Sequence, residues 1–93
     1  MKITYDPAKD AKNIRERNLS FGRAVEFDFE GATFLLDERL DYGETRRVAI
    51  GYLDGRLHFL CFVDTPEGIR VISFRKANPR EARKHGKPLT LDR

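Results

Sequence analysis

Basic side chains gather where an apolar, strand-like segment gives way to a polar one. Arg75 and Lys76 end the segment 70–76, which alternates at the period of a β-strand. The planar guanidinium of arginine fits a phosphate through two parallel hydrogen bonds, and the end of a sheet strand holds it rigidly. Because no acidic run accompanies these cations, RNA or DNA is the first candidate for a partner. We therefore expect Arg75 to stabilise a phosphate with Lys76 beside it, the alternative being a surface salt bridge.

The next segment is predicted to be a short basic helix. Asn78 is its expected N-cap, Pro79 takes the first helical position, and Glu81 can reach back to the cap amide. Gly86 is expected to end the helix. Three cations of this helix are expected to position a nucleic-acid backbone, unless they form an ordinary solvated face: Arg80, Arg83 and Lys84.

A carboxylate and an arginine two residues apart form a second candidate set. Glu44 and Arg46 share a face if a strand begins early enough to include both. A carboxylate held by arginine can act as a base, and a structural ion pair is the alternative. Arg70 is a candidate third member of this group.

The N-terminal segment is predicted to be a helix with Asp6 as N-cap, Pro7 at the first helical position and Asn18 as a left-handed C-cap. Its apolar stripe consists of Ala8, Ala11 and Ile14. Lys9 and Asn13 lie four residues apart on one side, so they are candidates for a second wall of a nucleic-acid groove. Simple solvation is the alternative for both.

The remaining segments predict an antiparallel sheet. A short opening strand covers 2–4, and a second short helix follows Ser20. Four strand-like runs then cover 33–37, 45–53, 56–64 and 69–76. Asp54-Gly55 is a typical two-residue hairpin turn, and 65–68 forms a longer turn. The expected fold class is α+β, with two N-terminal helices, a four-stranded antiparallel meander and a C-terminal basic helix.

Composition limits the chain to one small domain. We expect this domain to cover residues 1–86 of the 93, followed by a tail at 87–93. The net charge of +3 hides an asymmetry, since residues 26–44 hold seven acids and one base while the chain from residue 70 onward is basic. No apolar run is long enough to span a bilayer and no signal peptide is recognisable, so we expect a cytoplasmic protein without a membrane partner.

The sequence contains no residue pattern typical of a metal site. Cys61 is the only cysteine, and His58 and His85 are isolated from one another. The acidic residues between 37 and 44 are expected to form a solvated loop rather than a metal cage. We therefore expect neither a metal nor a cofactor.

Four motifs in sequence resemble the BrnT family of bacterial toxins. They are Tyr5-Asp6-Pro7-Ala8-Lys9-Asp10-Ala11-Lys12-Asn13; Leu19-Ser20-Phe21 with Ala24 and Phe27; Gly43-Glu44-Thr45-Arg46 leading to Ile50-Gly51; and residues 70–77 with Glu81 and Arg83. The resemblance implies a RelE-like fold and a small ribonuclease that inhibits translation. It also implies a BrnA-like antitoxin that neutralises the toxin and binds operator DNA only together with it.

Metal-independent RNA cleavage needs a proton acceptor, a proton donor and cations around the phosphorus. We predict Arg75, Glu44, Arg46 and Lys76 as the catalytic set, with Arg70 among the RNA-binding residues. The chain departs from the family in one respect, because Arg17-Asn18 stands where members usually carry His-Gly. Either that histidine is not required, or this chain is weakened, or another residue has taken the role.

Two alternatives remain open at this stage. A non-catalytic nucleic-acid-binding or regulatory partner with a degenerate site would fit the missing histidine. A protein-interaction domain would use the same cations to meet an acidic antitoxin segment.

Overall fold

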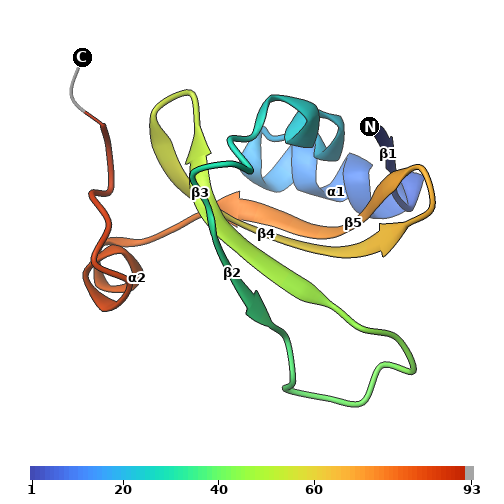
Figure 1. The fold of residues 1–93 in the computed structure, drawn as a ribbon. Helices are drawn as coiled ribbons and strands as arrows, with labels where there is room; N and C mark the ends of the chain where they lie inside the picture. Colours follow the sequence, from blue (N-terminus) through green and yellow to red (C-terminus); the bar gives the residue numbers. More distant parts are fainter. Residues whose placement is uncertain (92–93) are drawn as a thin grey trace.

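Five strands form one sheet in the order β1-β5-β4-β3-β2 in the computed structural model of the chain, which describes residues 1–91. The strands are β1 (Lys2–Thr4), β2 (Thr33–Leu36), β3 (Arg47–Leu53), β4 (Arg56–Thr65) and β5 (Gly68–Lys76). The helical segments are α1 (Pro7–Arg17), the 3-10 helix η1 (Phe21–Glu26) and α2 (Pro79–Lys84). Figure 1 shows α1 and the turns of η1 on one side of the sheet, with α2 apart from them at the other.

The predicted four-stranded antiparallel meander is present, but the count of strands in the sheet is wrong. The meander of β2 to β5 is antiparallel, and Asp54 and Gly55 have the positive φ angles of a tight hairpin turn. However, β1 joins as a fifth strand parallel to β5, with Ile3 opposite Ile69. This pairing links segments far apart in the sequence, so no local turn signal announces it.

The two faces of the sheet are covered unequally. The face under α1 and η1 carries the larger core, formed by Phe21, Ala24, Phe27, Leu60, Phe62 and Phe74 with their neighbours. We call this the α1 face. The opposite α2 face has a small core in which Ala82 of α2 packs with Ile50 and Leu57. The second expected helix is only a 3-10 segment, capped as predicted by the Ser20 side chain.

Helix α1 is attached through polar side chains rather than its apolar stripe. Ile14 is 44% exposed, whereas Asn13 is the buried residue of this helix. The Asn13 amide donates to the carbonyl oxygens of Leu19 and Phe74, both at 2.9 Å. Asp10 Oδ1 accepts from the Phe21 N–H at 2.7 Å. The helix is thus fixed by hydrogen bonds to the turn after it and to β5.

A β-bulge interrupts the alternation predicted for residues 70–76. Cys61 of β4 pairs with Ser73, but the next residue, Phe62, pairs with Val71. Ile72 is therefore an extra residue in β5. As a result Val71 and Phe74 both face the α1 side, although they are three residues apart.

Both ends of α2 have the expected stabilising geometry. Asn78 and Glu81 form a reciprocal capping box. At the other end Gly86 is left-handed, and the N–H groups of Gly86 and Lys87 donate to the carbonyl oxygens of Arg83 and Ala82. His85, the residue between helix and glycine, is thereby fixed in the turn.

The described part of the expected tail lies against the β3–β4 hairpin. The N–H of Leu57 donates to the Leu89 carbonyl at 2.9 Å, and that of Leu91 donates to the Gly55 carbonyl at 2.8 Å. Residues 92 and 93 of that tail lie outside the described residues. Among residues 1–91, no helix combines the length and the apolar character needed to cross a bilayer.

Candidate active site

A groove of about 410 Å³ lies on the α2 face, between the loop after β2 and helix α2. We call it the α2-side groove. Its floor includes Val48, Phe59, Cys61 and Ser73 from three neighbouring strands. Its charged and titratable lining consists of Asp37, Glu38, Arg39, Arg75, Lys84 and His85. The groove therefore brings cations from the sheet, the loop and the helix around one cavity.

Arg75 is held in a fixed orientation on the groove wall. Its Nη1 and Nη2 donate to the two carboxylate oxygens of Glu81 at 2.9 and 2.8 Å. Its guanidinium carbon lies 4.7 Å from the centre of the Phe59 ring. The hydrogen bonds to Arg75 lower the pKa of Glu81 to about 2, so this carboxylate stays ionised. Because the Arg75 guanidinium uses Nη1 and Nη2 to bind Glu81, its Nε–H remains available to a phosphate.

His85 shares the Phe59 side chain with Arg75. The His85 ring packs edge-on against Phe59 with ring centres 5.8 Å apart. An imidazole and a guanidinium thus flank one aromatic ring inside the groove. Imidazole is the side chain whose ordinary pKa suits proton transfer near neutral pH.

Glu44 is neutralised by two arginines. Arg70 Nη2 donates to both Glu44 oxygens at 2.7 Å, and Arg46 Nε donates to one at 3.3 Å. Arg46 also lies over the Tyr42 ring, 3.9 Å from its centre. The bonds from Arg70 hold the pKa of Glu44 below its usual value. A carboxylate with a lowered pKa is a weak proton acceptor, so the geometry favours a structural role for Glu44.

Asp37 is buried, contrary to the solvated loop expected from the sequence. Its side chain is only 2% exposed and accepts from Arg39 Nε and Nη2, both at 2.8 Å. These bonds lower the pKa of Asp37 to about 2. The Cys61 Sγ lies 3.9 Å from Asp37 Oδ2, and burial raises the pKa of the thiol. Asp37 therefore anchors the groove loop and holds Arg39 at its rim.

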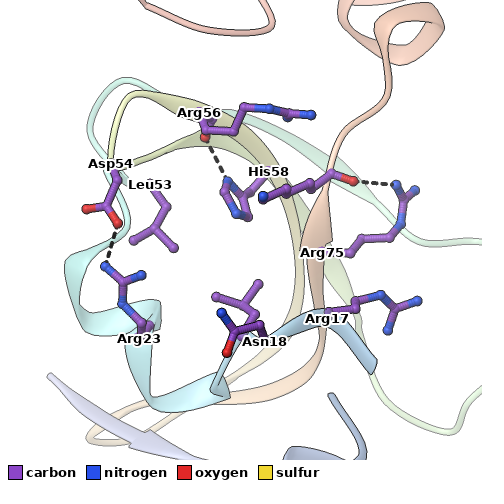
Figure 2. A pocket seen from close by; sticks show the side chains of 10 residues that line it. Arg17, Asn18, Arg23, Leu53, Asp54, Arg56, His58 and Arg75 are labelled. Atoms are coloured by element: carbon purple, nitrogen blue, oxygen red, sulfur yellow. Dashed lines mark hydrogen bonds and ion pairs between the residues drawn. The ribbon is translucent and has the colours of Figure 1, made fainter. Parts of the chain in front are cut away.

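The structure separates the four predicted catalytic residues. Arg75 and Arg46 lie on the α2 face, where Glu44 pairs with Arg46. Lys76 follows Arg75 in β5, and consecutive strand residues point to opposite faces. Lys76 instead lines a second pocket with His58, which Figure 2 shows from close by. Arg75 also lines this second pocket, so the predicted action of Lys76 beside Arg75 stays a prediction.

The predicted RNA-binding residues are also dispersed. Arg70 is on the α2 face with Glu44, and Lys84 lines the groove. Arg80 and Arg83 are exposed on α2, and Lys9 is exposed on α1. Asn13 is buried and its amide fixes α1. It lines a further cavity together with Lys9, so their role as a second wall for RNA stays a prediction.

Sequence reasoning gives too little weight to two members of the groove. In the sequence Arg39 is only the single base of an acidic stretch, and its spacing from Asp37 is the available signal. The default interpretation of His85 is a cation at the helix end, with general acid as the less favoured alternative. Only the turn at Gly86 and the packing against Phe59 bring it to Arg75.

Comparison with known proteins adds the family. The model of the ribonuclease toxin BrnT of type II toxin-antitoxin systems matches residues 5–81. The chain belongs to the BrnT family. It is similar to the crystal structure of the Brucella abortus ribonuclease toxin BrnT, with a TM-score of 0.64 and 28% sequence identity. That match covers 84% of this chain and 97% of the Brucella chain. No curated protein sequence matches the chain.

Membership in the BrnT family confirms the resemblance seen in the sequence. It identifies the chain as a ribonuclease toxin of a type II toxin-antitoxin family, which implies an RNA substrate and an antitoxin partner. The α+β architecture with one mixed sheet agrees with the similarity to the Brucella BrnT structure.

Proposed function

We propose that this BrnT chain is a metal-independent endoribonuclease that cuts RNA in the α2-side groove and so inhibits translation. The observation that carries the proposal is the placement of Arg75 and His85 on the same Phe59 side chain. One group is a fixed cation that fits a phosphate, and the other can transfer a proton near neutral pH.

The proposed reaction is an intramolecular attack that requires a base, an acid and cations around the phosphorus. The ribose 2′-hydroxyl attacks the adjacent phosphorus, its proton passes to a base, and the 5′-oxygen leaves with a proton from an acid. His85 is our candidate for one of these proton transfers. Arg75 donates to a phosphate oxygen as negative charge builds on it, and pre-oriented donors of this kind contribute most when they need no rearrangement. Arg39 and Lys84 add positive charge at the rim.

The fixed ion pairs of the groove support this assignment. Arg75 is oriented by Glu81, and Arg39 is oriented by Asp37. A guanidinium that is already oriented loses little conformational entropy when it binds a phosphate. Glu44 and Arg46 line a separate cavity that shares Asp37 with the groove, and we assign them a structural role rather than proton transfer.

The proposal extends to the antitoxin partner and to the fold family of the chain. We propose a RelE-like fold and a BrnA-like antitoxin that inhibits by covering the groove cations with acidic side chains. Operator DNA would be bound only by the toxin with its antitoxin. A cytoplasmic location fits a substrate such as messenger RNA.

The test is RNA cleavage by the purified chain in the presence of EDTA. We expect cleavage by the native protein and about a hundredfold slower cleavage by Arg75→Ala, the cost of losing one pre-oriented donor. Arg15→Ala, which removes an exposed cation of α1, is the control and should match the native rate. Intact RNA after incubation with the native chain, or equal rates for Arg75→Ala and the native chain, would refute the proposal.

A non-catalytic RNA-binding role is the second candidate. Arg17 replaces the histidine usual in the family, and an arginine side chain cannot accept a proton near neutral pH. RNA binding that weakens steeply with salt, without any cleavage, would favour this role.

A further inference from the structure

A second cavity, of about 530 Å³, lies at the end of β5, and Arg75 lines both this cavity and the groove. It opens between the end of α1, η1 and the β3–β4 hairpin, and we call it the hairpin pocket (Figure 2). Its volume is in the range of small-ligand sites. Its lining residues include Asn18, Leu19, Leu53, Arg56, His58 and Lys76.

His58 gives this pocket an unused hydrogen-bond acceptor. The residue is only 3% exposed, and its Nδ1 lies 2.7 Å from the Arg56 carbonyl oxygen. A carbonyl oxygen only accepts, so Nδ1 carries the proton and Nε2 carries a lone pair. Burial lowers the pKa of the imidazole, which keeps the ring neutral at neutral pH. Within residues 1–91, Nε2 has no hydrogen-bond partner, and the atom is not sealed from solvent, so it is accessible from the pocket.

The walls of the hairpin pocket combine apolar and basic groups. Leu19 and Leu53 are buried core residues that reach its surface. Lys76 and Arg56 line it and make no ion pair with any described carboxylate. Arg23, by contrast, is neutralised by Asp54 at 2.7 Å and by Glu26. Positive charge is therefore left over beside an apolar wall.

The Asn18 side chain adds a hydrogen-bond donor to the hairpin pocket. Asn18 occupies the left-handed turn after α1, with a φ of 53°, and its side chain makes no hydrogen bond within the described residues. Figure 2 shows Asn18 and His58 on different walls of the same pocket. The pocket thus offers both a donor and an acceptor, together with a flat apolar wall and cations.

We propose that the hairpin pocket binds one nucleotide of an RNA strand, with the base against Leu53 and the phosphate toward Lys76 and Arg56. A base or a ribose brings N–H or O–H donors to His58 Nε2 and acceptors to Asn18. The carboxylates of an acidic peptide are acceptors only, so its side chains would not satisfy Nε2. The proposal deepens the ribonuclease function, since the bound strand would be the substrate held outside the groove.

The test measures nucleotide binding by the full chain without any cleavage. AMP, adenosine and inorganic phosphate are titrated while the ring nitrogens of His58 are followed by NMR. We expect AMP to bind and shift the His58 Nε2 signal, and adenosine to shift it more weakly. Lys76→Ala and Asn18→Gly should each weaken AMP binding by about tenfold, the loss of one good hydrogen bond or charge. Glycine suits the positive φ at position 18, so the turn is kept.

Arg15→Ala removes the same charge from an exposed site on α1 and should leave AMP affinity unchanged. The proposal is overturned if AMP leaves the His58 signal unmoved, or if both pocket variants bind AMP like the native chain. Inorganic phosphate or a glutamate-rich peptide that binds as tightly as AMP would also overturn it. Cleavage is scored separately, so a chain that binds AMP here but leaves RNA uncut refutes only the proposed ribonuclease activity.

Discussion

The α2-side groove and the hairpin pocket share Arg75 in their lining, and their other charged groups are arranged differently. In the groove, Arg75 and Arg39 are each paired with a carboxylate. In the hairpin pocket, Lys76 has no carboxylate partner among residues 1–91, and a histidine nitrogen is left unpaired. Paired guanidinium groups have fixed directions but weak net charge, which suits stabilisation of a developing charge. Unpaired cations attract a polyanion from solution without specifying its geometry.

This difference implies that the groove acts in cleavage and the hairpin pocket acts in binding. Arg75 lines both cavities, whereas Lys76, which the strand directs to the opposite face, lines only the hairpin pocket. Changes in the groove should affect the rate of cleavage, whereas changes in the hairpin pocket should affect binding. The following experiments, from the largest expected effect to the smallest, test that contrast.

Replacement of His85 should have the largest effect. His85→Gln is expected to lower the rate of RNA cleavage by about a hundredfold, because loss of a positioned proton-transfer group costs at least that much. RNA affinity should hardly change. The measurement is single-turnover cleavage. A cleavage rate like that of the native chain would assign proton transfer elsewhere.

Replacement of Asn13 should lower the stability of the α1 side. Asn13→Ala leaves two carbonyl oxygens inside the protein without their donor, which costs about 2 kcal/mol of unfolding free energy. Urea unfolding followed by circular dichroism measures the difference. Lys12→Ala, an exposed neighbour on the same helix, is the control and should unfold like the native chain. If the two variants are equally stable, the attachment of α1 does not depend on this amide.

Neutralising Glu81 should have a smaller effect that depends on pH. The carboxylate has a pKa of about 2 when folded and an ordinary value of 4.5, so its stabilisation is full above pH 4.5 and is lost as the pH falls toward 2. Glu81→Gln keeps the capping acceptor and should cost about 1 kcal/mol at pH 7. The difference in melting temperature between the native chain and Glu81→Gln should disappear near pH 2. A difference that stays constant from pH 7 to pH 2 would show that the ion pair is not its cause.

The smallest effect is expected for Glu44. Because Arg70 and Arg46 already hold its charge, Glu44→Gln should change the cleavage rate by less than about fivefold, within the range of an ion pair that is partly exposed. The assay is the same single-turnover cleavage. A loss of a hundredfold or more would restore Glu44 to the role of base that the sequence predicts.

Local signals made much of the fold predictable. The caps at Asp6, Ser20 and Asn78, the left-handed Asn18 and the Asp54-Gly55 hairpin are all confirmed, because each depends on residues within a few positions of one another. The fifth strand was not predictable in this way, since β1 pairs with residues more than sixty positions away. The bulge at Ile72 was not predictable either, because residues 70–76 alternate in the sequence as a regular strand would.

The candidate site was predictable only in part. Arg75 was chosen for its residue type and its place at the end of a strand, and the structure puts it in a groove. Its orientation by Glu81 and its proximity to His85 result from the turn at Gly86 and from packing on Phe59. Such contacts between distant residues are decided by tertiary structure, and residue spacing does not encode them.

The extra residue in β5 has a consequence for the chemistry of both cavities. Arg70 and Arg75 are five positions apart, a spacing that would send them to opposite faces of a regular strand. Ile72 adds one step to the count, so both arginines end on the α2 face and Lys76 on the other. Deletion of Ile72 would restore a regular strand, so the residues at the end of β5 would point to the opposite faces. The cations at the end of β5 would then change faces between the α2-side groove and the hairpin pocket, although no charged residue would be lost.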